Sequence, residues 1–274
     1  KKIIFFLSFF ILVFIITLLT FLNKKSFTSF NDLDVNESSF IAHAGGGFKD
    51  VTYSNSRESV IESIQKGFKL IELDLLETSD GFIVAAHDWK TFKENCLDFK
   101  GQVDNNPITY QEFNECNYQI NSINFTKLNE ENINKIFNNN TDLYLVTDKI
   151  RNYKLLSKKF SFKERIIPEI FTIYGYISSK FYGFERPIFP FKKYNFFVQK
   201  FFNVRLINIS YKDFIKNKEK VTNLFNKGLE IYVYTSNDKT FIENYINKNI
   251  TGIYTDFWNF NMKRCESENK CRSY

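Results

Sequence analysis

Two hydrophobic patterns divide the chain. Residues 3–22 are apolar except for three hydroxyl side chains, and a pair of lysines stands on each side of them. At about 1.5 Å per residue, twenty helical residues span about 30 Å, the thickness of one hydrocarbon core. This pattern predicts an uncleaved signal anchor, a single transmembrane helix, over residues 1–25. The alternative is a cleaved signal peptide, although no small-x-small cleavage site follows Leu22.

The rest of the chain alternates short apolar, β-rich segments with amphipathic helical segments. The first strand candidates are FIAHAG and KLIELDL, the last are LEIYVYT and GIYTDF, and SRESVIESIQKGF is one of the helical segments between them. Segments that are apolar at nearly every position are typical of parallel strands covered on both faces. The pattern predicts an α/β fold, and a (β/α)8 TIM barrel over residues 40–274 rather than an open sheet. The rhythm breaks after the second strand, which predicts an insertion at about residues 90–140.

Residues 26–39 are polar and are expected to form a juxtamembrane linker. Within them, the sequence DVNES places Asn36 in an Asn-x-Ser pattern preceded by an acid, which resembles the acceptor site of bacterial N-glycosylation systems.

Charge and cysteine content narrow the class of protein. The 37 basic and 31 acidic residues are spread along the chain, so the net charge of +6 does not indicate nucleic-acid binding. Cys96 and Cys116 are near each other in the sequence, as are Cys265 and Cys271, which predicts two local disulfides in an oxidising compartment. Four free thiols in a cytosolic protein are the alternative. With the anchor, the disulfides predict a single-pass, membrane-anchored protein whose folded domain lies in the bacterial periplasm or at the cell surface.

The segment IELDLLETSDGFIVAAHDW (residues 71–89) carries candidate chemistry. Strand alternation places Glu72 and Asp74 on one face and apolar residues on the other. Two carboxylates so close would raise each other's pKa unless a cation lay between them, and oxygen ligands suit Ca²⁺ or Mg²⁺. The Asp-Gly turn then returns the chain so that His87 lies near these acids. The other histidine of the chain, His43, ends the first predicted strand, where catalytic residues of such barrels occur.

These segments carry a family resemblance. The stretches IAHAGGG, YSNSRESV, GFKLIELDLLETSDGFIVAAHDW, VTDKI, RIIPEIF and GIYTDF resemble successive motifs of the glycerophosphodiester phosphodiesterase family, in a bacterial branch also similar to phosphatidylinositol-specific phospholipase C barrels. The resemblance extends over residues 40–258. It implies a metal-dependent phosphoric diester hydrolase in which His43 and His87 are the acid/base pair. It also implies that Glu72, Asp74 and Asp148 are the metal ligands.

The sequence departs from the family pattern at three places. The arginine that usually follows the first histidine is Ala44, the Glu-Asn-Thr motif is Ser54-Asn55-Ser56, and the lysine expected two residues after the third acid is Ile150. The remaining candidates for substrate binding are Gly45, Gly46, Asn55 and Lys149.

The register of the third motif leaves two alternatives. If Tyr144, Val146 and Asp148 face the barrel, Asp148 supplies a third carboxylate to the metal. If the other face does, Lys149 enters the site instead and could replace the missing arginine.

The expected substrate is a glycerophosphodiester-type small molecule or a lipid head group. One histidine would take a proton from the nucleophile and the other would protonate the leaving alkoxide, with the order open. A phospholipase C-like reaction that leaves a cyclic phosphate, and a non-catalytic barrel that binds envelope glycans or lipids, are the alternative functions.

Overall fold

The protein is described by a computed structural model that places residues 2–22, 39–195, 198, 202, 204–260 and 262–274. In this part of the chain, eight parallel strands form one sheet with the spatial order β8-β7-β2-β1-β12-β11-β10-β9. Their bounds are β1 (Phe40–Ala42), β2 (Leu70–Glu72), β7 (Tyr144–Thr147), β8 (Ile166–Pro168), β9 (Phe189–Pro190), β10 (Leu206–Ser210), β11 (Glu230–Tyr234) and β12 (Gly252–Thr255).

The two ends of this sheet meet. A parallel bridge joins Glu169, directly after β8, to Ile188, directly before β9. The backbone amide of Ile188 donates to the carbonyl of Pro168 at 2.9 Å, and the amide of Ile170 donates to the carbonyl of Ile188 at 2.8 Å. Because the strands follow one another around the ring in chain order, the fold is a TIM-like α/β barrel. The strand candidates FIAHAG, KLIELDL, LEIYVYT and GIYTDF contain β1, β2, β11 and β12, and the strand that the sequence did not reveal is the two-residue β9.

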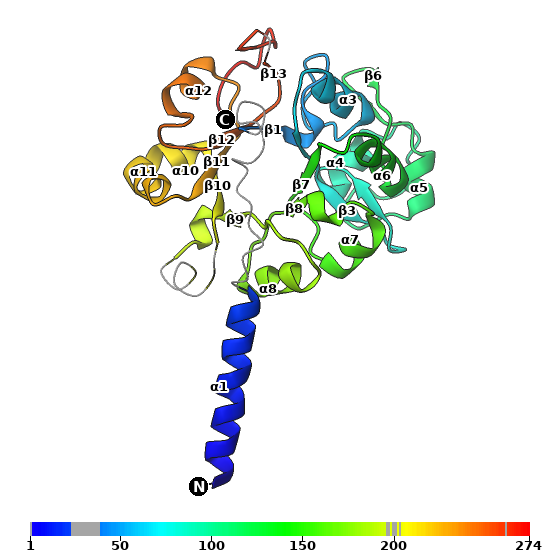
Figure 1. Ribbon diagram of the computed structural model, residues 1–274. Coiled ribbons are helices and arrows are strands. Elements are labelled where there is room, and N and C mark those ends of the chain that lie inside the picture. Colours follow the sequence, from blue (N-terminus) through cyan, green and yellow to red (C-terminus); the bar gives the residue numbers. More distant parts are fainter. Residues whose placement is uncertain (1, 23–38, 196–197, 199–201, 203, 261) are drawn as a thin grey trace.

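Helices cover the outside of the barrel (Figure 1). They are α3 (Arg57–Gln65), α6 (Glu130–Asn139), α7 (Tyr153–Lys159), α8 (Ile173–Phe181), α10 (Tyr211–Lys216), α11 (Lys218–Asn226) and α12 (Lys239–Tyr245), with the short 3-10 turns η2 (His43–Gly45), η3 (Lys163–Arg165) and η4 (Phe191–Lys193). Polar side chains begin most of them. Ser56 accepts from the amide of Ser59 at the start of α3, and Asn129 accepts from that of Asn132 at the start of α6.

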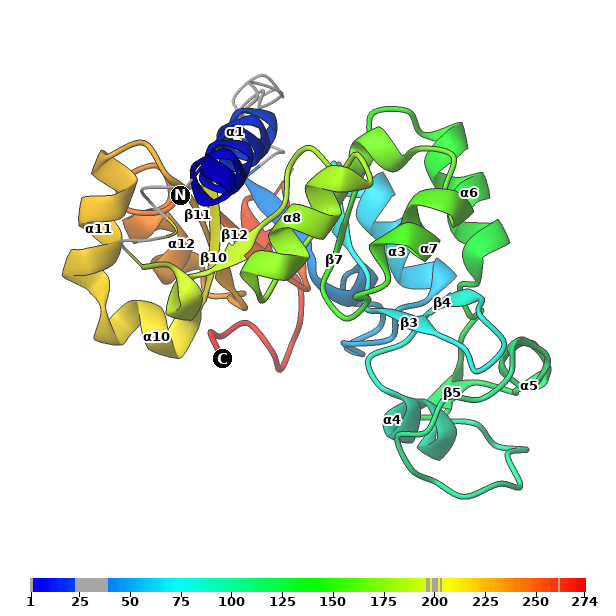
Figure 2. The same cartoon turned by 90° about the horizontal axis from the view of Figure 1, so that it is seen from below.

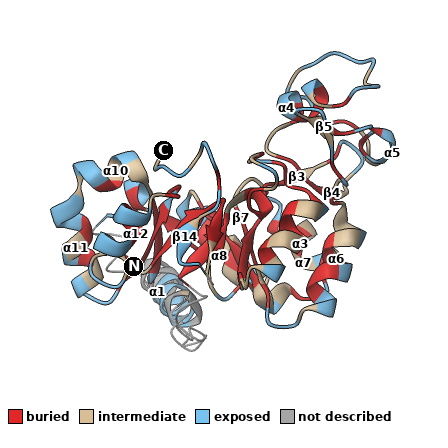
Figure 3. Ribbon diagram, turned by 90° about the horizontal axis from the view of Figure 1, so that it is seen from above, coloured by how far each residue is buried: buried red, intermediate tan, exposed pale blue. Residues whose placement is uncertain are grey.

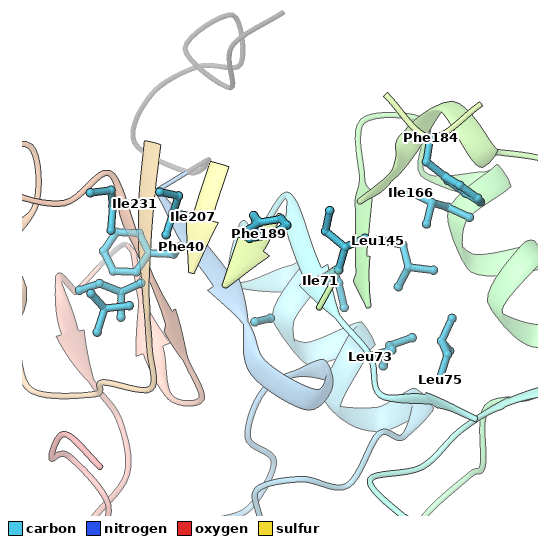
Figure 4. Packing of buried hydrophobic residues seen from close by; sticks show 14 of the residues in the cluster. Phe40, Ile71, Leu73, Leu75, Leu145, Ile166, Phe184, Phe189, Ile207 and Ile231 are labelled. Carbon is cyan, nitrogen blue, oxygen red and sulfur yellow. The ribbon is translucent and has the colours of Figure 1, made fainter. Parts of the chain in front are cut away.

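Alternation along the strands gives the barrel two apolar layers. Ile41, Leu70 and Val146 belong to a small cluster inside the ring. Their neighbours Ile71 and Leu145 belong to the larger cluster between strands and helices, part of which Figure 4 shows. The strands are therefore buried on both faces, while the outer surfaces of the helices are exposed (Figure 3). This is the pattern from which the parallel sheet was predicted.

The chain between β2 and α6 forms a disulfide-bonded lobe. This lobe projects from one side of the barrel (Figure 2). Its Cys96–Cys116 bond is the predicted one, and the lobe has its own apolar cluster around Phe92 and Phe113. The lobe is built from the hairpin β3 (Leu75–Glu77) and β4 (Ile83–Ala85), α4 (Trp89–Glu94), α5 (Tyr110–Glu115), β5 (Gln119–Ile120) and β6 (Ile123–Asn124). The insertion ends earlier than predicted, because α6 buries Ile133 and Phe137 in the main core.

The C-terminal segment folds back on the barrel. It contains the short hairpin β13 (Trp258–Asn259) and β14 (Arg264–Cys265), and the predicted disulfide between Cys265 and Cys271. The ring of Trp258 stacks on Phe40 of β1 with a centroid distance of 5.3 Å, so this segment covers the start of the first strand.

The N-terminal helix α1 (Lys2–Leu22) extends away from the barrel (Figure 1). Within the described residues, no helix has both the length and the apolar composition that crossing a bilayer requires. The predicted transmembrane helix is therefore not supported. The predicted linker, apart from Ser39, and Asn36 lie outside the described residues.

Candidate active site

Three carboxylates meet at the carboxyl ends of β2 and β7. Glu72 is the last residue of β2, Asp74 follows two residues later, and Asp148 comes directly after β7. Oxygen atoms of the three side chains all lie within 4.8 Å of one another. Glu72 pairs with Val146, which faces the barrel interior, so the register is the one in which Asp148 also faces inward. The alternation of β7 thus brings the three acids together.

The electrostatics of this cluster suit a cation. Burial raises the pKa of Glu72 well above its usual range, and the charges of Asp74 and Asp148 add to the effect. Burial likewise raises the pKa of Asp148, with further contributions from Asp74 and Glu169. The Oδ1 atom of Asp148 is buried and has no hydrogen-bond partner among the described residues. A divalent cation would supply that partner and offset the repulsion, so the donor set fits the predicted metal.

Hydrogen bonds from two neighbouring groups fix the orientation of Glu72 and Asp74. The backbone amide of Ala44 donates to Oε2 of Glu72 at 2.6 Å. The side-chain amide of Asn55 donates to Oδ2 of Asp74 at 2.9 Å, and the amide nitrogen of Asp74 donates back to Oδ1 of Asn55 at 2.9 Å. Asn55 is 1% exposed and does not line the cavity. Although Asn55 was predicted as a substrate ligand, its side chain holds Asp74 in the structure.

Lys149 also reaches the acids, although it belongs to the other face of its strand. Its Nζ lies 3.5 Å from Oδ1 of Asp74 and 3.5 Å from Oδ2 of Asp148. The two register alternatives therefore do not exclude each other, because β7 ends at Thr147 and the chain after it no longer alternates. Burial lowers the pKa of Lys149, but the charges of the neighbouring acids outweigh it and raise the pKa overall. Lys149 is a fixed positive charge beside the carboxylates.

Each histidine is held by a carboxylate. Nδ1 of His43 lies 2.9 Å from Oδ1 of Asp256, which directly follows β12. Nδ1 of His87 lies 2.6 Å from Oδ2 of its neighbour Asp88. Since an ionised carboxylate can only accept, Nδ1 donates in both pairs and Nε2 is left for other chemistry. Sequence reasoning assigned no role to Asp88 or Asp256, although both stand in motifs that it singled out.

The environment of His43 favours its protonated form. Burial lowers its pKa, but the hydrogen bond and the charge of Asp256, together with Asp74 and Glu169, raise it above the usual value. Tyr53 stands between the two imidazoles. Its ring meets His43 edge to face at 4.5 Å and His87 at 5.2 Å between centroids.

The two histidines, the three clustered acids, Lys149 and Tyr53 line one cavity of about 220 Å³. A fourth acid, Glu169, lies in it at the end of β8, where it accepts hydrogen bonds from Asn208 and from the hydroxyl of Tyr254. Sequence reasoning assigned no role to these three residues, although Glu169 and Tyr254 stand in the motifs RIIPEIF and GIYTDF, because each is a single polar side chain in an apolar strand segment. The cavity is lined by His43, Tyr53, Glu72, Asp74, His87, Asp148, Lys149, Glu169, Phe171, Asn208, Tyr234 and Tyr254.

The glycines after His43 serve packing rather than the cavity. Gly46 has φ +94°, and a Cβ there would lie 2.1 Å from Oγ of Ser63 in α3. Its amide donates to the carbonyl of His43, and that of Gly47 donates to the carbonyl of Asp256. Gly45 and Gly46 were predicted to bind phosphate through their amides, but neither lines the cavity and the amide of Gly46 is already engaged.

The segment that carries most of this site matches a known protein family. Residues 44–174 match the model of the glycerophosphoryl diester phosphodiesterase family, a segment that holds His87 and the three clustered acids. The family assigned from the motifs is confirmed over this segment, and with it the enzyme class, a phosphoric diester hydrolase.

Solved structures share the fold. A glycerophosphodiester phosphodiesterase from Parabacteroides distasonis is 18% identical, with a TM-score of 0.61 over 80% of this chain and 92% of its own. An Oleispira antarctica phosphodiesterase, solved with the product sn-glycerol-3-phosphate, is 15% identical, with a TM-score of 0.63 over 82% of this chain and 95% of its own. An enzyme from Thermotoga maritima is 21% identical, with a TM-score of 0.55 over 80% of this chain and 94% of its own. At such identities the likeness shows the fold alone. No curated protein sequence matches the chain.

Proposed function

We propose that the protein is a metal-dependent phosphodiesterase that hydrolyses glycerophosphodiester-type or related envelope phosphodiesters by histidine acid/base catalysis. The observation that carries this proposal is the convergence of two carboxylate-bound imidazoles and three clustered acids on one cavity. The groups come from strands far apart in the sequence. A structural core has no use for such a set of ionisable side chains.

Glu72, Asp74 and Asp148 would hold the metal, Ca²⁺ or Mg²⁺. When bound, a divalent cation supplies charge stabilisation for the phosphoryl oxygens in the transition state. Asn55 and the amide of Ala44 keep Asp74 and Glu72 in place for this purpose. The free Oδ1 atom of Asp148 supports its assignment as the third ligand.

His43 and His87 would act as the acid/base pair. In each, Nδ1 is committed to a carboxylate, so proton transfer to or from the substrate takes place at Nε2. Asp256 and Asp88 orient the rings, as the orienting carboxylate does in other acid/base pairs. The structure holds His43 more deeply than His87, with side-chain exposures of 14% and 39%.

Lys149 would bind the substrate phosphate in place of the missing arginine. Position 44 is an alanine, which is buried and cannot contact a substrate through a charged group. Of the cavity-lining residues, Lys149 carries the only permanent positive charge. An ammonium ion is a point charge rather than a bidentate fork, so phosphate recognition would depend on charge more than on geometry.

The glycerophosphodiester substrate is supported by two likenesses. One is the family match, and the other is the fold shared with the Oleispira antarctica enzyme that binds sn-glycerol-3-phosphate. A location outside the cytoplasm is supported by the two disulfides, which persist in oxidising compartments.

The test is an activity screen of the purified protein against a panel of glycerophosphodiesters, with Mg²⁺, Ca²⁺ or a chelator present. We expect metal-dependent release of a phosphomonoester, followed by phosphorus NMR. Accumulation of a cyclic phosphate would favour the phospholipase C-like reaction. Binding of these compounds without turnover at any metal concentration would favour a non-catalytic barrel.

A further inference from the structure

A second cavity adjoins the first. It has a volume of about 160 Å³ and shares three lining residues with the candidate active site, namely Phe171, Asn208 and Tyr234. It lies between the ends of β9 and β10, because Pro190 and Ile209 also line it. The two cavities are therefore adjacent and meet at these three side chains, so an ester arm of a phosphodiester bound at the three acids would lie next to the second cavity.

The walls of the second cavity are apolar. Besides Phe171 and Tyr234, they include Pro190, Phe191 and Ile209. The side-chain nitrogen of Asn208 donates to Glu169, and its Oδ1 has no hydrogen-bond partner among the described residues. Most of the remaining surface consists of rings and aliphatic carbon, which gains free energy from contact with another apolar group and offers little to a polar one.

The charged groups at the rim are largely paired with each other. Nζ of Lys192 lies 3.0 Å from Oδ2 of Asp213. The hydroxyl of Ser210 donates to the same carboxylate. Lys192 and Asp213 therefore offset each other's charge, and Lys193 is the remaining charged residue of the lining. Because most of the wall is apolar, the second cavity selects mainly by apolar contact.

Exposed apolar side chains follow closely in sequence after the cavity-lining Phe171. Directly after Phe171, the first turn of α8 exposes Ile173 and Tyr174, the latter at 79%. Because α8 begins where β8 ends, these side chains lie at the same edge of the barrel as the cavities.

We infer that the second cavity is a subsite for a linear apolar chain, carried by the alcohol on one ester of the phosphodiester. This inference rests on the proposed phosphodiesterase function and narrows its substrate class to phosphodiesters with an alkyl or acyl arm. The reaction remains hydrolysis. Water adds to phosphorus, one phosphorus–oxygen bond breaks, and the proton of the water replaces phosphorus on the departing alcohol.

The test uses a series of glycerophosphodiesters in which the second ester is a linear alcohol of one to eight carbons. Burial of one methylene group contributes about 0.8 kcal/mol, so kcat/KM should rise up to about fourfold per added carbon until the cavity is filled. Hydrolysis of all members with the same kcat/KM would overturn the subsite and leave the phosphodiesterase intact. Failure to hydrolyse any member would instead contradict the proposed function.

A variant pair checks that the second cavity is responsible. Phe191→Ala removes part of its wall, so the ratio of kcat/KM for the hexyl ester to that for the methyl ester should fall at least about tenfold, roughly the contact of two methylenes. Phe181→Ala is the control, because Phe181 is 70% exposed on α8 and lines neither cavity. The ratio is measured within one preparation, so partial loss of folded protein does not change it. An unchanged ratio in Phe191→Ala would contradict the assignment of the cavity.

Discussion

His43 and Asp256 are joined by a hydrogen bond of 2.9 Å between Nδ1 and Oδ1, although 213 residues separate them in the chain. The barrel makes this pair, because β1 lies beside β12 and Ala42 is in register with Thr255. His43 and Asp256, which directly follow these two strands, therefore lie side by side. Asn237, which follows β11, donates to the other oxygen of Asp256 at 2.8 Å and fixes the carboxylate.

Asp256→Asn should therefore alter the titration of His43 as well as the rate. Removal of the negative charge takes away the main influence that raises the pKa of His43, so the limb of the pH–rate profile that reports this group should move to lower pH. We expect kcat to fall between about 10-fold and 10²-fold, less than for loss of the imidazole itself. The measurement is the pH dependence of kcat/KM. A reduced rate with an unshifted profile would leave Asp256 a merely structural role.

The acid cluster predicts how stability depends on pH. Glu72 and Asp148 have raised pKa values, so the folded protein binds more protons than the unfolded chain above about pH 4. Their contribution to stability is fully present below that pH and is lost as the pH rises through the folded-state values. A metal binds the ionised carboxylates, so its stabilising effect should grow over the same interval.

Glu72→Gln isolates this effect from the other titrating groups. Without metal, the variant should melt above the wild type at neutral pH, and each gain of about 1 kcal/mol corresponds to about 2–4 °C for a chain of this size. With Mg²⁺ or Ca²⁺ at 100 times Kd, the wild type should gain about 2.7 kcal/mol, and the variant much less. Thermal melts from pH 4 to pH 8, with chelator and with metal, check both. Equal metal-induced shifts in the two proteins would remove Glu72 from the metal site.

Neutral substitutions of Asp148 and Lys149 should change the metal affinity in opposite directions. Asp148→Asn removes a ligand, so metal affinity should fall by at least about tenfold, or 1.4 kcal/mol. Lys149→Met removes a positive charge 3.5 Å from two of the ligands, so metal affinity should rise while KM for the phosphodiester increases. Calorimetric titration with metal and steady-state kinetics separate the two. Weaker metal binding in Lys149→Met would show that the lysine organises the site.

The Cys96–Cys116 bond should stabilise the lobe that it closes. The two residues are 20 apart, and a loop of this length predicts about 3 kcal/mol of stabilisation. The double variant Cys96→Ser/Cys116→Ser should be cleaved by protease within residues 88–129 before the barrel is. The corresponding double variant at Cys265 and Cys271 is the control, because that bond closes a separate segment. Cleavage in the barrel first would show that the lobe does not depend on its disulfide.

Local patterns were sufficient to predict most of the barrel and two of the acids, Glu72 and Asp74, whereas Asp148 was predicted only from the family resemblance. Strands such as β2 and β11 are apolar on nearly every position, and an alternating strand fixes which of its side chains share a face. Strand β9 escaped because two residues, one of them a proline, carry no periodicity. The end of the insertion was predicted too late in the chain. Most residues of α6 are polar, so its sequence looks like a continuation of the polar insertion.

The remaining parts of the site depend on closure of the ring. Glu169, Asn208 and Asp256 are isolated polar residues near the ends of different strands. Only the order of strands brings Glu169 and Asn208 to one cavity and Asp256 to His43, which lines it. The glycines after His43 could be seen to matter, but not that their close neighbours would be Ser63 and Phe257 rather than a substrate. Tertiary neighbours are not encoded in a local pattern.

The central claim is that His43 and His87 perform the proton transfers, and the turnover of each alanine variant tests it most directly. Turnover is measured at saturating metal and substrate, with the metal-induced thermal shift of each variant as the control for an intact fold and metal site. We expect His43→Ala and His87→Ala each to retain that shift and to lose at least about 10²-fold in kcat. Near wild-type turnover in either variant would contradict it.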